Sequence, residues 1–409
     1  KIFASHGTSI YTVDFTSPAS AFPSSGADVK HTVGSSTGAW QFINFNNRLT
    51  CIHEDIVPQR YDGSLTAGSM WAAFDNAHRP SSVTSSQFKP SCGMGFYGRM
   101  WVGGVAESKD VIYYSSLLDA DDFRTTAENG ASNGGSIDLK SVWGDDDIVA
   151  IAPFFGKLVI FGKENIAIYN SPSIIGSMAL DEVIQGIGCV SRDSVQAIGD
   201  DLVFISSTGL RSIARTTEKD KLPLMDLSLN IKDTLIRNIG QSTNIKATYV
   251  ENEGIYIISF IDNNITYVFD FKHKTPNATP RVTTWTFDND REPASMAYTT
   301  LYGLVVGQKD GSIAGYEGYY DTDLAGASTY TNASYTGNFS TTWVNLGESV
   351  AASLLKRLFM VLEGGSGATL GLKWYKDFSP TPSTTTQITL NPVTTGSTSL
   401  WGASSSLYG

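Results

Sequence analysis

The strongest constraint on the fold is a pair of short apolar runs, joined by a tight turn, that recurs along most of the chain. The runs are rich in Val, Ile, Tyr and Phe, and each pair is bounded by Gly, Asp or Asn, which is typical of β-hairpins. The pairs begin about 50 residues apart. Their first residues are Lys1, Arg48, Gly98, Gly156, Asp200, Glu253 and Tyr302. The chain is therefore predicted to consist of repeated β units.

A period of this length holds about four strands. Because a twisted four-stranded sheet cannot cover its own apolar faces, such sheets stack radially around an axis and close into a ring. The sequence therefore predicts an all-β fold with a β-propeller of six or seven blades. The number is six if the first and last hairpins complete a single blade.

The expected propeller occupies residues 1–321, with one short helical insertion near 220–240, where apolar residues recur at every fourth position. Residues 322–335 are polar, small and turn-forming, so they are expected to be a linker. A small C-terminal β module, ending in a Ser/Thr-rich arm, is expected over 336–409. Within it, the two β runs that flank the GGSG turn are expected to pair.

Charge and cysteine content exclude several classes of protein. Asp and Glu number 40 against 29 Lys and Arg, which gives a net charge of -11, so an electrostatic surface for holding nucleic acid tightly is not expected. Cys51, Cys92 and Cys189 are an odd number at wide spacings, which argues against a disulfide framework and a closed zinc site. They are expected to be buried, reduced thiols.

Motifs that carry chemistry are missing from the sequence. There is no GxxxxGK[ST] loop, no GxSxG elbow, and none of the five histidines falls at HExxH spacing. No apolar stretch is long enough for a membrane helix. We therefore expect no catalytic residue, no cofactor and no bound metal, and we expect that the chain is not an enzyme and does not insert into a membrane.

Two acidic loops are the remaining candidates for a site, LLDADDF and WGDDDIV. Closely spaced carboxylates can serve as an acid/base pair or bind calcium, but in loops between blades they can also simply solvate the surface. The residues concerned are Asp119, Asp121, Asp122, Asp145, Asp146 and Asp147.

Three consecutive segments resemble a known family. Residues 96–123 (FYGRMWVGGVAESKDVIYYSSLLDADDF), 148–170 (IVAIAPFFGKLVIFGKENIAIYN) and 186–214 (GIGCVSRDSVQAIGDDLVFISSTGLRSIA) are similar, in this order, to successive blades of short-tailed (podovirus) bacteriophage tail proteins. The family is the tail nozzle, tail tubular protein B-like or packaged-DNA stabilisation group. No single motif is diagnostic, and the resemblance depends on the ordered succession.

The resemblance implies a structural virion protein of the phage tail, assembled in the host cytoplasm. It implies a ring of identical subunits, usually a homohexamer, that continues the DNA channel below the portal and adaptor. Such a ring retains the packaged genome and lets it pass at DNA ejection. The implied partners are other copies of the chain, the tail adaptor protein, tail fibres or spikes, and double-stranded DNA that passes without tight binding. The six carboxylates above are then expected near the channel or its mouth, and no catalytic residues are carried over.

The alternative is a propeller that recognises the host by binding or cleaving surface glycans. Exposed tryptophans would serve as sugar platforms in such a protein, and Trp40, Trp71 and Trp285 are the candidates. Tryptophans in a chain of this composition are more often part of the core.

Overall fold

The computed structural model divides the chain into two compact units, Lys1–Glu317 and Gly318–Gly409. Each unit is described by itself. The residues whose structure is described are 2–6, 9–13, 29–32, 39–65, 69–84, 87–126, 133–213, 226–275, 279–287, 291–316, 322–325, 331–334, 337–338, 340, 369–375, 379, 381–382 and 384–389.

The first unit is a succession of antiparallel sheets of three or four strands. The N-terminal sheet contains β1 (Ile2–His6), β2 (Ser9–Val13) and β3 (Val29–Thr32). The next two sheets contain β4 (Gln41–Phe45), β5 (Arg48–His53), β6 (Ile56–Tyr61) and β7 (Trp71–Ala73), then β8 (Cys92–Phe96), β9 (Arg99–Gly103), β10 (Val111–Tyr114) and β11 (Gly135–Asp138).

Four further sheets complete this unit. The first two contain β12 (Ile148–Phe154), β13 (Lys157–Gly162), β14 (Asn165–Asn170) and β15 (Ala179–Gln185), then β16 (Gln196–Ile198), β17 (Asp201–Ser206) and β18 (Gly209–Ser212). The last two contain β19 (Ile245–Val250), β20 (Ile255–Phe260), β21 (Ile265–Lys274) and β22 (Pro280–Trp285), then β23 (Pro293–Thr299), β24 (Gly303–Gln308) and β25 (Ile313–Tyr316).

The repeated hairpins of the sequence are confirmed. From the second onward, each predicted pair forms the second and third strands of its sheet, as β13 and β14 do, and the first pair forms β1 and β2. In the six later sheets, the first strand was not part of the predicted hairpin, because a loop or helix separates it from the preceding repeat. The chain is mostly β, and its fold is a β-propeller with a small additional C-terminal sheet.

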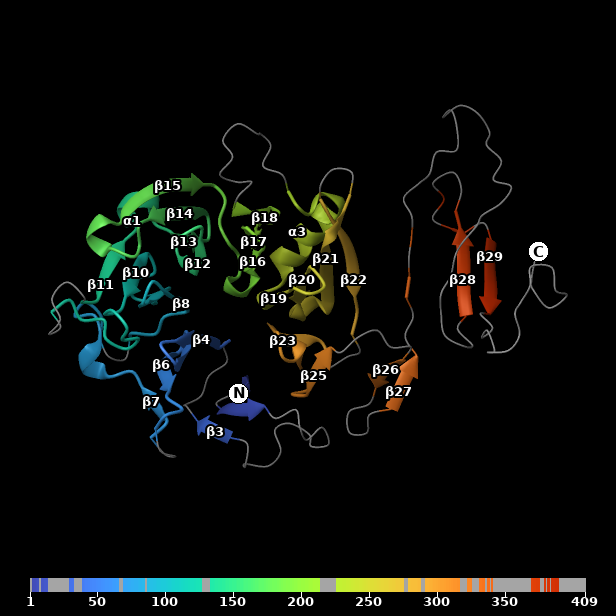
Figure 1. The fold of residues 1–409 in the computed structure, drawn as a ribbon. Coiled ribbons are helices and arrows are strands. Elements are labelled where there is room, and N and C mark those ends of the chain that lie inside the picture. The colour runs from blue at the N-terminus through green and yellow to red at the C-terminus, as the bar shows by residue number, and fades with distance from the viewer. Residues whose placement is uncertain are drawn as a thin grey trace. The chain divides into compact units, whose positions relative to one another are not determined.

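The six sheets from β4 to β25 are the six blades, numbered one to six here, and Figure 1 shows their first strands nearest the centre. Neighbouring first strands contact one another, as β8 does with β4 and β12. The count of six does not arise from a shared blade of the first and last hairpins, because among the described strands β1–β3 and β23–β25 are separate sheets. The N-terminal sheet instead packs on blade one, where Phe3 contacts Tyr61 and Trp71.

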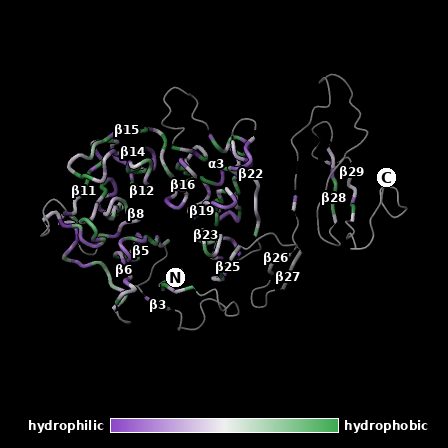
Figure 2. The backbone as a smooth tube through the Cα atoms, in the orientation of Figure 1, coloured by the Kyte–Doolittle hydropathy of each residue, from purple (hydrophilic) through white to green (hydrophobic). Residues whose placement is uncertain are grey.

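The core lies in layers between adjacent blades. The strands of these blades contain apolar (green) stretches in Figure 2. Between blades two and three, the buried Trp101 packs in one cluster with Leu158 and Tyr169. Each fully buried large apolar side chain contributes about 1.5–3 kcal/mol to folding. All three cysteines are free and buried, as the sequence predicted.

Helices are few in the described part of the chain. The predicted insertion contains α3 (Lys232–Gln241), whose Leu235 and Ile239 are buried against blades four and five, while residues 214–225 lie outside the described residues. The other described helices are α1 (Lys140–Trp143) and the 3-10 turns η1 (Asn76–His78), η3 (Ile175–Ser177), η4 (Arg192–Ser194), η5 (Leu229–Ile231) and η6 (Ile261–Asn263). Of these described helices, none has the length and apolar character needed to cross a bilayer.

The second unit contains two described hairpins. The first, β26 (Thr322–Ala325) with β27 (Thr331–Ser334), falls inside the stretch predicted to be a linker, so that stretch carries regular structure. The second pairs β28 (Thr369–Trp374) with β29 (Thr384–Thr389). β28 is the predicted strand after the GGSG turn, but its described partner follows it in sequence, and the run predicted to pair with it lies outside the described residues.

Candidate functional site

The loop between β10 and β11 holds two of the three aspartates of the LLDADDF motif inside the fold. Asp121 is buried and pairs with Arg60 of β6, with 2.5 Å between Oδ2 and Nη1. Asp122 is buried as well and accepts from the Nε and Nη2 atoms of Arg124, at 2.9 and 3.0 Å. Asp119 is half-buried, and its Oδ1 lies 3.4 Å from the backbone nitrogen of Asp121. Asp121 therefore fastens this loop to blade one, while Asp122 and Asp119 bond within the loop.

The two buried carboxyls of this loop differ in their proton affinity. Burial raises the pKa of Asp121 to about 6, and the neighbouring Asp119 adds to this rise, while the charge of Arg60 opposes it. Burial also acts to raise the pKa of Asp122, but the hydrogen bonds and the charge of Arg124 outweigh it, so that the pKa of Asp122 lies below its usual range.

The second acidic loop, between α1 and β12, is organised around Asp146. This buried carboxylate accepts from the backbone nitrogens of Lys163, Glu164 and Asn165, at 2.9, 3.1 and 2.9 Å, and from Nδ2 of Asn165 at 2.9 Å. The first two nitrogens belong to the turn between β13 and β14, and the third belongs to the first residue of β14. Asp146 therefore accepts the hydrogen bonds of these backbone N–H groups, which would otherwise need water as their acceptor.

The neighbours of Asp146 are more exposed. Asp147 pairs with Lys163 at 2.6 Å and with Lys109 at 3.3 Å, and the hydrogen bond from Lys163 is the main reason that its pKa lies below the usual range. Asp145 is exposed. Of the six carboxylates predicted to face a channel, Asp121, Asp122 and Asp146 are buried and Asp147 is held in ion pairs. Of the other two, Asp145 is exposed and Asp119 is half-buried.

The structure does not support a metal site in either loop. Among the described residues, no group of three or more His, Cys, Asp and Glu side chains converges as metal ligands would. The carboxylate oxygens of Asp122 and Asp146 are directed at protein donors instead. The alternatives of acid/base chemistry and calcium binding gain no support from this geometry.

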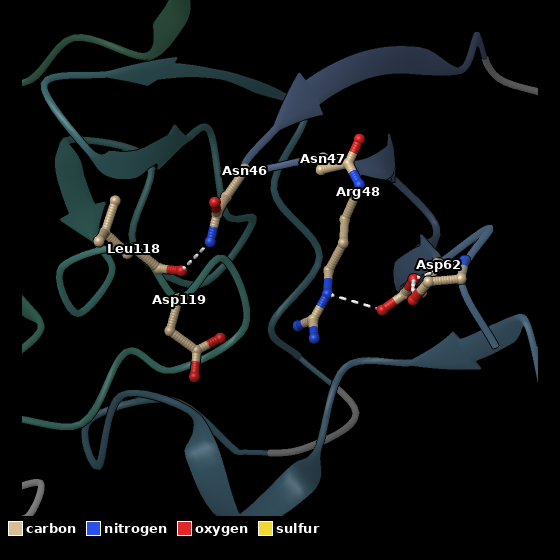
Figure 3. A pocket seen from close by; sticks show the side chains of 7 residues that line it. Asn46, Asn47, Arg48, Asp62, Leu118 and Asp119 are labelled. Carbon is tan, nitrogen blue, oxygen red and sulfur yellow. Dashed lines mark hydrogen bonds and ion pairs between the residues drawn. The ribbon is translucent and has the colours of Figure 1, made fainter.

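A shallow pocket of about 390 Å³ lies where blades one and two meet (Figure 3). Arg48 reaches across it to Asp62, with 3.0 Å between Nε and Oδ2, and Asn46 donates from Nδ2 to the carbonyl of Leu118 at 2.8 Å. Asn47, Ser64 and Asp119 complete the lining. Arg48 and Asn46 therefore already donate hydrogen bonds to protein acceptors. The pocket is a gap between two blades, and its geometry does not indicate a ligand.

The group that sequence reasoning missed is a cluster of charges at the propeller axis, formed by Arg192, Asp193 and Lys246 and called the hub below. Arg192 lies in η4, donates from Nε to Asp193 at 2.9 Å, and donates through its Nη atoms to the carbonyls of Ser91 and Ala39. Lys246 of β19 pairs with the other oxygen of Asp193.

The hub ties together four blades, since Ala39 leads into β4, Ser91 leads into β8, η4 precedes β16 and Lys246 lies in β19. All three side chains are mostly buried. Burial acts to raise the pKa of Asp193, but the charges of Arg192 and Lys246 outweigh this effect and the pKa is lowered. The innermost strands are thus joined across the axis by an arginine, and no motif in VSRDS signals this.

The three tryptophans of the glycan hypothesis are packed against neighbours. Trp71 contacts the rings of Tyr61 and Phe3, with centroids 4.9 and 5.8 Å away. Trp40 lies 5.0 Å from the ring of His53. Trp285 packs against the core cluster between blades five and six. None of the three is fully exposed, so they do not form the open platforms that this alternative needs.

The comparisons with known proteins list similar solved structures but no family. No family model and no curated protein matches the chain. Among solved structures, the chain is similar to a streptogramin B lyase, with 11% identity and a TM-score of 0.40 over 69% of this chain and 84% of that one. It is also similar to Hsv2 of Kluyvelomyces marxianus, with 12% identity and a TM-score of 0.39 over 69% and 76% of the two chains. At this identity, the likeness concerns the propeller fold alone.

Proposed function

We propose that this chain is a structural subunit of a short-tailed phage tail, in which several copies form a ring that continues the DNA channel below the portal and adaptor. The observation that carries the proposal is the ordered succession of the three segments that resemble the tail nozzle group. The described residues of segments 96–123, 148–170 and 186–214 belong to blades two, three and four. The resemblance thus follows the repeat of the fold, blade by blade.

The electrostatics are compatible with a conduit. A chain with a net charge of -11 repels the phosphates of a passing duplex at short range, and this repulsion acts within about one Debye length of the wall, roughly 8–10 Å. Such a wall lets DNA slide without holding it. Since Asp121, Asp122 and Asp146 are buried, Asp119 and Asp145 are the members of the two acidic loops that could contribute to this surface.

The hub determines where a channel could lie. Arg192 crosses the centre of the propeller and bonds to the segments leading into β4 and β8, so a duplex could not pass along the axis of a single subunit. In this proposal, the channel is therefore enclosed between copies of the chain. The expected partners are other copies, the tail adaptor, and fibres or spikes.

The experiment that tests the proposal is a cryo-EM reconstruction of the recombinant chain and of the particle that carries it. We expect a closed ring on the tail axis whose opening admits a DNA duplex, with each propeller axis blocked by Arg192. A chain that is monomeric in solution and displayed away from the tail axis would contradict the proposal and favour the glycan-binding alternative.

A further inference from the structure

The loop between β10 and β11 places two carboxyl groups against each other. The side chain of Asp121 is only 6% exposed, and it is hydrogen-bonded to the side chain of Asp119. Because an ionised carboxylate can only accept a hydrogen bond, this contact requires a proton on one of the two groups. The pair therefore shares one proton, whereas the buried carboxylates of Asp122 and Asp146 accept from N–H donors.

The charges that act on Asp121 come from its own loop and from two neighbouring elements. Arg60 of β6 pairs with its Oδ2 atom at 2.5 Å, His78 of η1 acts in the same direction, and Asp119 acts in the opposite one. Arg60 can neutralise only one of the two carboxylates. When the shared proton leaves, two like charges therefore remain in contact at a site that is largely shielded from water, which is unfavourable. Loss of the proton favours separation of the two side chains.

The residue before Asp119 has a strained backbone. Leu118 has φ of 61°, a left-handed conformation that few residues other than Gly and Asn adopt. Its backbone nitrogen donates to the carbonyl of Gly98 at 2.6 Å, and its carbonyl accepts from Nδ2 of Asn46 at 2.8 Å. Packing contributes little, because the Leu118 side chain is 60% exposed. Strain of this kind persists only while the surrounding contacts maintain it, and the contact between Asp119 and Asp121 is one of them.

A second cation lines the pocket beside Asp119. Arg48 is part of the same lining and pairs with Asp62 at 3.0 Å, and in Figure 3 its guanidinium group lies between Asp62 and Asp119. A guanidinium group carries five N–H donors, so it can bond to two carboxylates at once. The pocket of about 390 Å³ leaves room for the Asp119 side chain to turn toward Arg48.

We propose that the loop between β10 and β11 is a pH-dependent switch with two arrangements. In the protonated arrangement, which this structure shows, Asp119 bonds to Asp121. In the ionised arrangement, Asp121 stays paired with Arg60, while Asp119 turns into the pocket and pairs with Arg48. The proton leaves to solvent, and each carboxylate then has its own cation. This inference goes beyond the proposed function, because it concerns a change within a single chain.

The switch changes an exposed part of the surface. Leu117 and Leu118 directly precede Asp119 and are 47% and 60% exposed, so they move when Asp119 turns. The change takes place in mildly acidic solution, since burial and the neighbouring Asp119 raise the pKa of Asp121 to about 6. Below this pH the shared proton stays bound, and above it the ionised arrangement is favoured.

The first test follows the loop with a fluorescent probe in the full chain. An environment-sensitive fluorophore on Leu117→Cys labels this position selectively, because the native cysteines are buried. Its signal should change with a midpoint near pH 6, and Asp121→Asn should abolish the change, because an amide does not titrate. Asp145→Asn is the control, since it removes an exposed carboxylate of the other acidic loop, and it should leave the midpoint within about 0.2 pH unit. A signal that stays constant between about pH 5 and pH 7 would overturn the switch.

The second test identifies the partner of Asp119 in the ionised arrangement. Arg48→Met removes the cation of the pocket and should raise the midpoint by about 0.5 pH unit, because the ionised arrangement then lacks one of its two cations. Arg48 is 42% exposed, so this variant is expected to fold even if Asp121→Asn does not. Lys157→Met is the matched control: it breaks a comparable ion pair with Asp181, at 2.7 Å in blade three, and should leave the midpoint unchanged. Equal midpoints in Arg48→Met and the wild type would overturn the proposed second arrangement.

Discussion

The two ends of the propeller axis use opposite kinds of residue. At the end where the first strands begin, the hub buries Arg192, Asp193 and Lys246 and uses their charges to join four blades. At the end where the first strands turn back, Tyr97 and Phe155 expose aromatic rings on strained turns. Both arrangements invert the usual distribution of charged and apolar residues. The difference indicates that one end maintains the fold and the other is available to bind.

The largest expected effect tests whether buried charge maintains the fold. Asp146→Ala removes the acceptor for three backbone N–H groups at the β13–β14 turn, and we expect it to lower the free energy of unfolding by about 3 kcal/mol. Urea denaturation measures this change. Asp145→Ala, one residue earlier and exposed, should change the free energy of unfolding by less than about 0.5 kcal/mol. Equal effects of the two substitutions would show that the buried carboxylate of this loop contributes no more to stability than the exposed one.

The hub itself is the next test. Arg192→Met keeps the apolar stem but removes the donors to Ser91 and Ala39, so we expect a loss of about 2 kcal/mol in the free energy of unfolding. Lys163→Met is the matched control, since it breaks an exposed ion pair with Asp147 and should cost less than about 1 kcal/mol. A hub variant as stable as this control would show that the blades stay joined without the arginine.

The pH dependence of stability tests the buried carboxyl of Asp121 in the loop between β10 and β11. The folded-state pKa of Asp121 is about 6, above the unfolded value near 4, so the folded protein holds the proton more tightly between these values. The contribution of Asp121 to the free energy of unfolding is fully present below pH 4 and is lost as the pH rises through 6. We expect the free energy of unfolding of the wild type to fall by about 1 kcal/mol over that interval, a small change because partial contact with solvent screens the charge. Asp121→Asn should abolish this fall, because the amide does not titrate.

Asp122→Asn is the control for this measurement. The pKa of Asp122 is lowered, so its contribution is present above the unfolded value near 4 and is lost as the pH falls below it. The two variants should therefore change the stability profile on opposite sides of pH 4. Identical profiles for both variants would contradict the assignment of Asp121 as the protonated member of the loop.

The smallest expected effect concerns the strained turns. Tyr97→Asn should raise the free energy of unfolding by about 0.5–1 kcal/mol, because Asn tolerates the left-handed backbone. Tyr302→Asn is the control, as Tyr302 is a similarly exposed tyrosine in the turn of blade six and has no positive φ. Thermal unfolding of both variants measures the difference, and a loss of stability in Tyr97→Asn would mean that the ring supports the fold.

The sequence predicts those parts of this protein that depend on local pattern. The hairpins of blades one to six alternate apolar and turn residues within about 20 positions, so their period was sufficient to predict the propeller. The hub was not predictable, because Arg192 bonds to carbonyl groups 101 and 153 residues away, and a carbonyl group has no sequence signature. The acidic loops were visible as clusters, but their burial depends on partners such as Arg60 and the turn after β13, which the clusters do not reveal.

The long reach of Arg192 also sets an order of events during synthesis. Ala39 and Ser91 leave the ribosome well before Arg192, and the segments leading into β4 and β8 wait for a partner that lies 153 and 101 residues further along. Closing such loops is entropically costly, so these contacts form late in folding. Until Arg192 has been synthesised, the carbonyl groups of Ala39 and Ser91 at the inner edge of the first two blades lack their hydrogen-bond donor.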